Sequence, residues 1–591
     1  MPTSSRIFGR AWKPSPIFYK KTKKLLQFCK LYDIIDELTK KIGKNSGESR
    51  THLRAPKVYG KHKLLLNLSG KRTGLIKICC CLTLQRSKFI LTFFRVFKNA
   101  KIKRKLEEQK MEEKTLVTIG EILTKIDDWV WGIPLIVLIL AAGIFLTCRT
   151  KLVQVRKLPL ALKYMLKDEE GAEGEVSSFG ALCTALSATI GTGNIVGVAT
   201  AIAAGGPGAL FWMEVAAFFG MATKYAEGLL AVKYREIDEN GKVLGGPFYY
   251  IEKGMGKNWK WLGKLFSIFG IGAGLLGIGT ITQINGITSA VQNFFDPQNA
   301  AIAFSIGSNS YSWATVIAGL IVTIFVALVV IGGLKRISKV SEVIVPFMAI
   351  LYVACCLILV ITNITKIPDA VVLICKSAFN PQAVFGGAIG ITMKVAMQKG
   401  IARGIFSNEA GLGSAPIAAA AARTKEPVRQ GLVCMTGTFF DTIVICTMTG
   451  LAVVLTGAYE LAMDGTLAGA AVTTKAFELG LPFNNSVCAF LLMMCLVFFA
   501  FTTILGWDYY SERCLQYLVG DKKRVLQGYR IIYILAVFVG PYLTVEFVWT
   551  LADIMNGLMA FPNLIALFAL GGVIAAETKI YFDNLKKGQL K

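Results

Sequence analysis

Two runs rich in glycine and short polar residues interrupt apolar segments of the chain. Residues 191–194 read Gly-Thr-Gly-Asn, and residues 408–416 read Asn-Glu-Ala-Gly-Leu-Gly-Ser-Ala-Pro. These residue types are poor helix formers, and a break in a membrane helix is tolerated only where its backbone is buried in protein or lines a cavity. Half-helix N-termini offer N–H groups and partial positive charge to a carboxylate. Unwound carbonyls and hydroxyls can hold a cation, so the two runs predict a site that binds a carboxylate together with a cation.

The two runs correspond to each other. A shift of 220 residues superposes 191–194 on 411–414, and a stretch of small residues follows each run. The breaks lie five predicted membrane spans apart, and an odd number of spans per repeat turns the second repeat upside down. Paired interruptions of this kind indicate an inverted-repeat transporter with its binding site at the middle of the membrane. The alternative is that the glycines only allow close helix packing, as in the spacing of Gly193 and Gly197.

Other kinds of chemistry lack the residues that they need. The two histidines, His52 and His62, both precede Met111, which excludes Ser-His or Cys-His catalysis and His-ligated zinc from the rest of the chain. The 14 cysteines lie mostly in apolar segments, and we interpret them as small buried hydrophobic residues. A phosphate-binding loop would need a Gly-Lys-Ser/Thr ending that neither glycine run has. The sequence therefore predicts that the protein is not an enzyme.

The composition is that of a membrane protein. Hydrophobic residues make up 54% of the chain and charged residues 17%, whereas soluble domains are about 25% charged. Apolar runs of about 18 residues or more mark transmembrane helices, and we predict eleven of them, hence an all-α fold. The predicted helices cover residues 130–148, 177–204, 207–231, 265–292, 312–333, 341–363, 399–422, 430–457, 483–507, 527–546 and 549–576.

The predicted helices form two groups within a transporter domain over residues 111–591. Residues 177–363 and 399–576 are the predicted inverted repeats, and the helix 130–148 precedes them. Loops on the cytoplasmic side should be rich in Lys and Arg. One set of alternate loops, together with the C-terminal tail, holds 27 Lys and Arg, and the other set holds 7. We therefore predict a multi-pass protein of the cell membrane, in contact with lipid, whose C-terminus is cytoplasmic.

The first 110 residues differ from the rest of the chain. They hold 28 Lys and Arg against 6 Asp and Glu, so most of the formal net charge of +27 lies in this extension. One interpretation is a basic arm that binds anionic lipid or nucleic acid. We favour a segment that is disordered or is not native coding sequence, with translation beginning at Met111. Nucleic acid is then not expected as a partner.

Around both breaks the sequence resembles the alanine or glycine:cation symporter family, the sodium:alanine symporters. The resemblance covers roughly residues 120–580, and it rests on a combination of motifs rather than on any one of them. These motifs are residues 191–197, 205–213, 220–227, 408–416 and Trp-Asp-Tyr-Tyr-Ser-Glu at 507–512. The resemblance implies the five-plus-five inverted-repeat fold of the bacterial leucine transporter, with one extra helix in front. It also implies sodium-coupled uptake of a small neutral amino acid.

The resemblance further implies which residues bind the substrate and the sodium ions. Gly191, Thr192 and Gly193 would face the substrate carboxylate, and the amide oxygen of Asn194 would reach a sodium ion beside them. The other residues expected to line the substrate pocket are Gln283, Phe406, Ser407, Asn408 and Trp507. A second sodium site is expected from the carbonyls of Ser187 and Ile190 and the hydroxyls of Thr502 and Thr503. Without the resemblance, hydroxyls bonded to carbonyls four residues back would be the better interpretation of the two threonines.

Ionisable residues inside the predicted helices are further candidates for function, because burying a charge in a membrane is costly. They are Glu214, Glu227, Glu409, Asp441 and Asp508. Asp508 stands close in sequence to Glu512 and Arg513, and for these three residues we expect a solvated cluster of salt bridges near the cytoplasmic end of the helix.

The predicted function is sodium-coupled symport of alanine or glycine across the cytoplasmic membrane by alternating access. The nearest alternative is a cation-coupled transporter of another small solute. An ion channel would need rings of like residues around a pore, and a membrane enzyme would need catalytic residues that the chain does not offer. The oligomeric state stays open.

Overall fold

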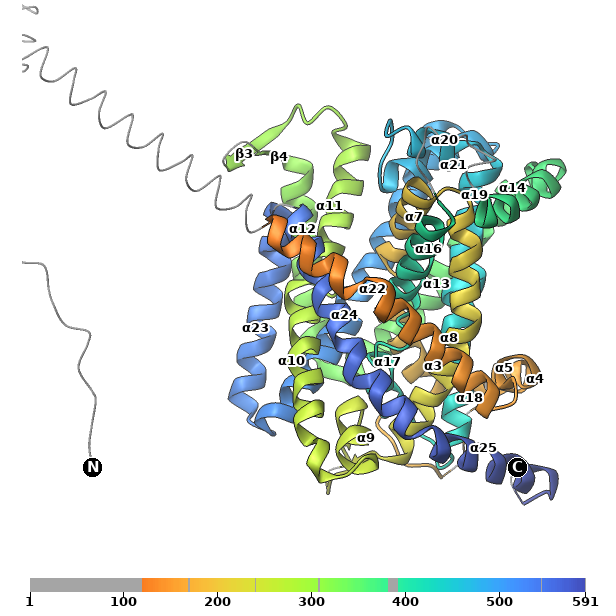
Figure 1. The fold of residues 1–591 in the computed structure, drawn as a ribbon. Coiled ribbons are helices and arrows are strands. Elements are labelled where there is room, and N and C mark those ends of the chain that lie inside the picture. Colours follow the sequence, from red (N-terminus) through yellow and green to blue (C-terminus); the bar gives the residue numbers. More distant parts are fainter. Residues whose placement is uncertain are drawn as a thin grey trace, which may run out of the picture. The chain divides into compact units, whose positions relative to one another are not determined.

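A computed structural model describes residues 120–589, apart from 168, 170, 240, 307–308, 381–391 and 544 and the side chains of 545–549 and 552. The N-terminal extension 1–110 and the proposed start at Met111 lie outside these residues. Most of the described chain is helical (Figure 1). The strands pair as two short antiparallel hairpins, β1 (Glu236–Ile237) with β2 (Val243–Leu244) and β3 (Ile302–Ile306) with β4 (Asn309–Ser312).

The helices fall into two series along the chain. The first series comprises α3 (Ile133–Arg149), α4 (Val153–Arg156), α5 (Leu158–Met165), α6 (Ser178–Thr189), the π-helix η1 (Gly193–Gly197), α7 (Val198–Gly205), α8 (Gly208–Lys233), α9 (Pro247–Gly254), η2 (Lys257–Trp259), α10 (Lys260–Leu276), α11 (Ile281–Phe295), α12 (Trp313–Val330) and α13 (Gly333–Thr362). The second comprises η3 (Ile364–Lys366), α14 (Ile367–Phe379), α16 (Met393–Asn408), α17 (Ala415–Ala419), α18 (Pro427–Thr438), the π-helix η5 (Phe439–Cys446), α19 (Thr447–Leu455), α20 (Ala458–Met463), α21 (Ala470–Gly480), α22 (Asn485–Val519), α23 (Lys523–Val539), η6 (Gly540–Tyr542), α24 (Val545–Ala569) and α25 (Gly571–Lys586).

Ten segments of the described chain have the length and apolarity of membrane-spanning helices. Eight are single candidates, and two are bent pairs, Ser178–Thr189 with Gly193–Gly205 and Asp553–Ala569 with Gly571–Lys586. The predicted all-α membrane fold is therefore confirmed. The predicted helix 399–422 overlaps α16 and α17, which are not among the ten. Because α16 carries Lys394, Lys399 and Arg403, its composition is more polar than that of an ordinary span.

The order of the helices is five plus five after one initial helix. α3 comes first. The broken helix formed by α6, η1 and α7 is then followed by α8, by α10 with α11, by α12 and by α13. The broken helix formed by α16 and α17 is followed by α18 continuing through η5 into α19, by α22, by α23 and by α24 with α25. Each series of five thus begins with a broken helix, as the two glycine runs predict.

The first break follows a regularly capped helix. The Ser177 hydroxyl accepts a hydrogen bond from the Gly180 N–H at 2.8 Å, which satisfies one of the free N–H groups at the start of α6. Ile190 then has an extended backbone, with φ −76° and ψ 94°. The chain resumes as η1, and the helices on the two sides of the break are bent by 52°. π-Turns of this kind are frequent at functional sites.

The second break is a sequence of left-handed residues. α16 ends at Asn408 because Glu409 has φ 55°, and Gly411 and Gly413 follow with φ of 90° and 82°. Glycine adopts positive φ without steric cost, whereas other residues rarely do. Pro416 then lies in the first turn of α17, where its missing N–H costs no helical hydrogen bond.

Two predicted helices are not continuous. The predicted helix 265–292 is two helices, α10 and α11, separated by residues 277–280, and the predicted helix 549–576 bends by 58° between α24 and α25. The first error has a physical reason in the five glycines between 270 and 279. They leave the segment apolar, so it resembles one span, but they have a low helix propensity and permit an interruption.

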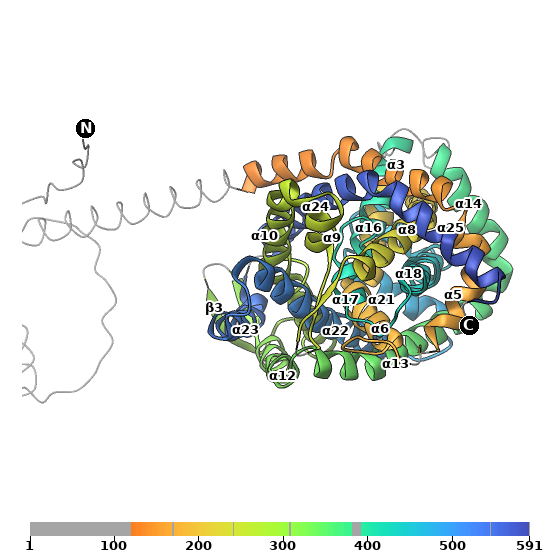
Figure 2. The ribbon, with the colours of Figure 1, turned by 90° about the horizontal axis from the view of Figure 1, so that it is seen from below.

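The broken helices lie toward the middle of the bundle. Figure 2 shows α16, α17 and α18 beside α8, with α3, α14 and α25 toward the outside. Glycines let α8 and α18 approach closely. A Cβ added to Gly228 would lie 2.5 Å from the Cys434 Sγ, and one added to Gly431 would lie 2.7 Å from the Tyr225 carbonyl oxygen. This close packing holds α8 against the segment that leads into η5.

Candidate functional site

The two breaks face each other. A Cβ added to Gly193 would lie 3.3 Å from the Ser407 Cα and 3.4 Å from the Phe406 Cδ1, so the first break packs directly on the end of α16. A Cβ added to Gly191 would lie 2.5 Å from the Thr503 hydroxyl on α22. The structure therefore brings together residues that the sequence placed in one site from segments more than 200 positions apart.

Backbone N–H groups of the first break are bonded to side-chain oxygens. The Gly191 N–H donates to the Asn194 Oδ1 at 2.9 Å, and the Thr192 N–H donates to the Gln283 Oε1 at 3.1 Å. The Gln283 Nε2 donates in turn to the Ile278 carbonyl, in the interruption between α10 and α11, at 3.0 Å. A carboxylate that used these two N–H groups would have to replace the oxygens of Asn194 and Gln283.

Asp441, which the predicted site did not include, connects the two breaks. It is fully buried in η5, and its carboxylate accepts hydrogen bonds from the Asn194 Nδ2 at 2.8 Å and the Ser407 hydroxyl at 2.9 Å. The Thr442 hydroxyl donates a third bond at 2.7 Å. The sequence signal for Asp441 was an ionisable residue in an apolar segment, but its partners could not be read from spacing.

The end of α16 is held by polar contacts to η5, to α22 and within the second break. The Asn408 Nδ2 donates to the Thr442 hydroxyl at 3.0 Å, and the Asn408 Oδ1 accepts from the Ala410 N–H at 2.9 Å. The Glu409 carboxylate accepts from the Trp507 Nε1 at 3.0 Å and from the Ser414 hydroxyl. Trp507 is fully buried on α22. Its indole thus contacts the second break, where the predicted pocket lies.

A second carboxylate supports the left-handed turn of the second break. The Glu227 Oε1 accepts from the Gly411 N–H at 3.1 Å and from the Asn563 Nδ2 at 2.7 Å. The Asn563 Nδ2 also donates to the Gly411 carbonyl at 2.9 Å. Glu227 and Asn563 therefore provide hydrogen-bond partners for the N–H and the carbonyl of Gly411, which lies outside the helices. The sequence identified Glu227 as an intramembrane carboxylate but gave no role to Asn563.

Lys224 supplies positive charge among these carboxylates. It is 3% exposed, and its Nζ has no hydrogen-bond partner among the described residues. It interacts electrostatically with Glu227, Glu409 and Asp441. A buried ammonium group and buried carboxylates lower each other's cost in a low-dielectric interior.

The predicted sodium ligands are brought together only in part. The Thr503 hydroxyl lies 3.2 Å from the Ile190 carbonyl oxygen, so α22 contacts the unwound end of α6. The Thr503 hydroxyl also donates to the Phe499 carbonyl of its own helix at 3.0 Å, and the Thr502 hydroxyl donates to the Phe498 and Phe499 carbonyls. The predicted role of the Ser187 carbonyl stays a prediction. The described residues contain no cluster of three or more His, Cys, Asp or Glu that could hold a metal ion. Carbonyl and hydroxyl oxygens are then the ligands that this region offers to a cation.

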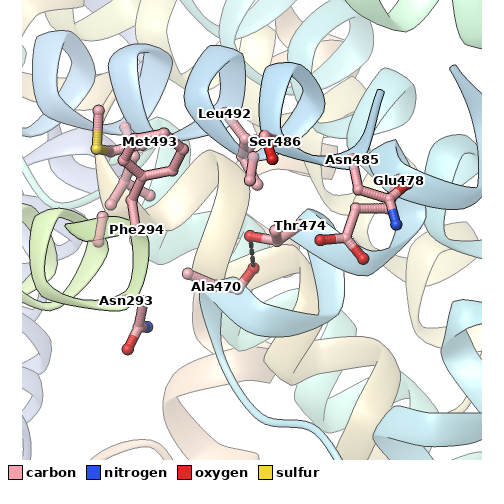
Figure 3. A pocket seen from close by; sticks show the side chains of 12 residues that line it. Asn293, Phe294, Ala470, Thr474, Glu478, Asn485, Ser486, Leu492 and Met493 are labelled. Carbon is pink, nitrogen blue, oxygen red and sulfur yellow. Dashed lines mark hydrogen bonds between the residues drawn. The ribbon is translucent and has the colours of Figure 1, made fainter. Parts of the chain in front are cut away.

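A cavity near the start of α22 contains none of the predicted site residues. It has a volume of about 270 Å³ and lies between α11, α21 and α22. Figure 3 shows the side chains that line it, among them Phe294, Glu478 and Met493, and the hydrogen bond from the Thr474 hydroxyl to the Ala470 carbonyl. α21 also contacts the first break, because the Thr473 hydroxyl donates to the Ile195 carbonyl at 3.3 Å.

Facing helix breaks inside a bundle of apolar helices define a membrane transporter with a central binding site. Residues 116–591 match the family model of the sodium:alanine symporter family, and the chain belongs to this family. The family consists of cation-coupled amino-acid symporters, so this chain is a multi-pass membrane transporter rather than a member of an enzyme family.

Named relatives cover nearly the same part of the chain. The sodium/alanine symporter AgcS of Methanococcus maripaludis is 46% identical over 476 residues, which are 80% of this chain and 98% of that protein. A Haemophilus influenzae protein described as an uncharacterized transporter is 56% identical, over 80% of this chain and 98% of its own. The probable sodium/glutamine symporter GlnT of Bacillus subtilis is 38% identical, over 78% of this chain and 91% of its own.

The bridging role of Asp441 leads to a prediction. Asp441→Asn keeps the size of the side chain but removes its charge and one acceptor oxygen, so the charge-assisted hydrogen bonds that connect the breaks are weakened. A hydrogen bond to a charged group contributes about 1.5–3 kcal/mol, and we expect substrate uptake by the reconstituted protein to fall by roughly tenfold or more. Asp369→Asn, an exposed change in the first turn of α14, is the control and should leave uptake unchanged. Equal uptake by both variants would contradict the role of Asp441.

Proposed function

We propose that this transporter carries a small neutral amino acid, alanine or glycine, into the cell together with sodium. The observation that carries the proposal is the meeting of the two breaks, in which backbone N–H groups, unwound carbonyls and hydroxyls converge. This set of groups fits a zwitterion and a small cation, since N–H groups favour a carboxylate and oxygen ligands favour a cation. The sodium/alanine symporter AgcS supports the same substrate, because 98% of the AgcS sequence matches this chain.

The tight packing between the breaks supports a short substrate side chain. The Phe406 ring lies close to Gly193, and Trp507 is fully buried beside the second break. Phe406 thus takes up space at the first break and Trp507 at the second. A methyl group or a hydrogen atom fits such a space with less rearrangement than a longer side chain. Glutamine is the second candidate substrate, because a probable sodium/glutamine symporter is among the relatives.

Sodium would complete the site in this proposal. A cation at the Ile190 carbonyl and the Thr503 hydroxyl would join α6 to α22, and it would offset the negative charge of the substrate carboxylate nearby. Binding both ligands would then favour the conformation in which the broken helices are closed on the site. Alternating access follows if the helices around the breaks move against the rest of the bundle.

The proposed orientation of the protein in the membrane rests on loop charge. Loops on the side of the C-terminal tail hold 27 Lys and Arg against 7 on the other side, and this bias is typical of the cytoplasmic side. α25, the last helix, ends at Lys586, three residues before the end of the described chain. We therefore place the C-terminus in the cytoplasm.

Reconstitution tests the cargo and the coupling. Purified protein in liposomes should accumulate labelled alanine when a sodium gradient points inward, and not when potassium replaces sodium on both sides. Unlabelled glycine should compete more strongly than glutamine, because its side chain is the smaller. Equal accumulation in potassium would exclude sodium coupling. Stronger competition by glutamine than by glycine would indicate that glutamine, rather than alanine or glycine, is the substrate.

The two adjacent threonines of α22 provide a matched pair for the sodium site. Thr503→Val removes the hydroxyl that reaches Ile190, whereas Thr502→Val removes one that bonds to its own helix. We expect Thr503→Val to raise the sodium concentration for half-maximal uptake about tenfold, which corresponds to about 1.4 kcal/mol. Thr502→Val should raise it by less. The reverse order would move the sodium site toward Thr502.

Reporter fusions test the orientation. A fluorescent protein joined after Lys591 folds in the cytoplasm, and it should be fluorescent in cells that express the full chain. Alkaline phosphatase joined at the same position needs export to become active, and it should stay inactive. An active phosphatase fusion would invert the proposed topology.

A further inference from the structure

A second polar cavity lies near the end of α22, away from the meeting point of the breaks. Its volume is about 510 Å³, and its walls come from the last third of α22, the start of α13, the first half of α23 and the loops before α6 and between β1 and β2. Of its lining residues, Gly332, Lys335, Asp521 and Lys523 lie in or beside the connections that are rich in Lys and Arg. It therefore opens on the face to which the proposed function assigns the cytoplasm.

Most charged groups around this cavity are paired. The Arg530 guanidinium binds both oxygens of Glu512, at 2.5 and 2.8 Å, which is the strong bidentate geometry. The other two ion pairs of the lining are Arg513 with Glu175 at 3.0 Å and Lys242 with Asp521 at 2.7 Å. The two arginines of the lining are thus already paired with other carboxylates.

Asp508 is different from these carboxylates. It lines the cavity and is 1% exposed, and its Oδ1 is buried with no hydrogen-bond partner among the described residues. The expectation of a solvated salt-bridge cluster of Asp508, Glu512 and Arg513 is wrong, because Glu512 pairs with Arg530 and Arg513 pairs with Glu175. A buried carboxylate oxygen without a donor is unfavourable unless a cation or a proton compensates it.

The position of Asp508 relates the cavity to the central site. It follows Trp507 on α22 and lies five residues, or about 7.5 Å along the helix axis, beyond Thr503. A cation that leaves Thr503 and Ile190 toward the cavity must pass this part of α22. Among the described residues that line the cavity, the Asp508 carboxylate is buried and forms no ion pair with another lining residue.

We propose that Asp508 forms an inner cation site, occupied by sodium between the central site and the cytoplasmic cavity. The inference rests on the proposed sodium coupling. The carboxylate attracts a monovalent cation strongly, because the surroundings of a buried group screen charge less than water does. Internal sodium therefore binds first at Asp508 during outward movement and leaves last from it during uptake. Arg530 interacts electrostatically with Asp508, but its guanidinium is bonded to Glu512, and Arg513 is paired with Glu175.

Vesicles with the cytoplasmic face inside test the site. The full-length protein, loaded with labelled alanine, is assayed for alanine exit at different internal sodium concentrations and for alanine uptake at different external ones. Asp508→Asn should raise the internal sodium concentration for half-maximal exit about tenfold, and it should leave the external value unchanged. Asp508→Glu, which keeps the charge, should restore most of the internal affinity.

The matched control is Asp521→Asn. Asp521 belongs to the same cavity, but its side chain is 57% exposed and paired with Lys242, so water screens it and the internal value should change little. Leu526→Glu adds a carboxylate to a buried part of the lining, where water screens it less, and should lower the internal value. This second variant keeps the test decisive if Asp508→Asn does not accumulate in the membrane, and an unchanged internal value would then count against the site.

The outcomes separate this inference from the proposed function. If the wild-type protein shows no dependence on sodium, the proposed coupling fails. If the wild-type protein depends on sodium but Asp508→Asn leaves internal and external values unchanged, the inner site is overturned and the carboxylate is a neutral, structural group. Equal shifts of both values would also overturn it, since they would show that Asp508 acts through the central site.

Discussion

A backbone N–H or carbonyl in the middle of a membrane must find a partner within the protein, because lipid offers none. Breaking two helices at that depth exposes such groups, and much of the polar chemistry of this bundle answers that need. Asn194 and Gln283 accept from the first break, while Glu227 and Asn563 serve Gly411 in the second. These buried polar residues therefore serve as partners for backbone groups that the broken helices leave unpaired. The proposed site lies where these groups come together.

The cost of this arrangement appears as buried charge. Three buried carboxylates interact electrostatically with Lys224, Glu227 on α8, Glu409 in the second break and Asp441 in η5. Their hydrogen bonds to neighbouring amides and hydroxyls spread the negative charge over several elements. Since the same network connects α8, α16, η1 and η5, a movement of one broken helix must change the partners of another. In the proposed mechanism, these hydrogen bonds would couple binding to conformational change.

The sequence predicted the parts of this structure that depend on local composition. Glycine at positions 191, 193, 411 and 413 identified both breaks, because the residue type itself disfavours a helix. The sequence did not identify Asp441 as the link between the breaks. Its contact with Asn194 joins residues 247 positions apart and depends on how η5 packs. The interruption between α10 and α11 was missed for a related reason. The apolarity of a segment indicates whether it can lie in lipid, but it does not indicate whether a glycine-rich segment stays helical.

Gly191 has a consequence for how members of this family diversify. A side chain at this position would collide with the Thr503 hydroxyl, since even a Cβ would lie 2.5 Å from it. In the proposed site, the main chain at this position would recognise the carboxylate that all amino-acid substrates share, and a side chain could not be added there without moving Thr503. Differences in substrate preference would then have to arise in the other walls of the site. Under the proposed function, substrate preference could therefore evolve without any change at Gly191.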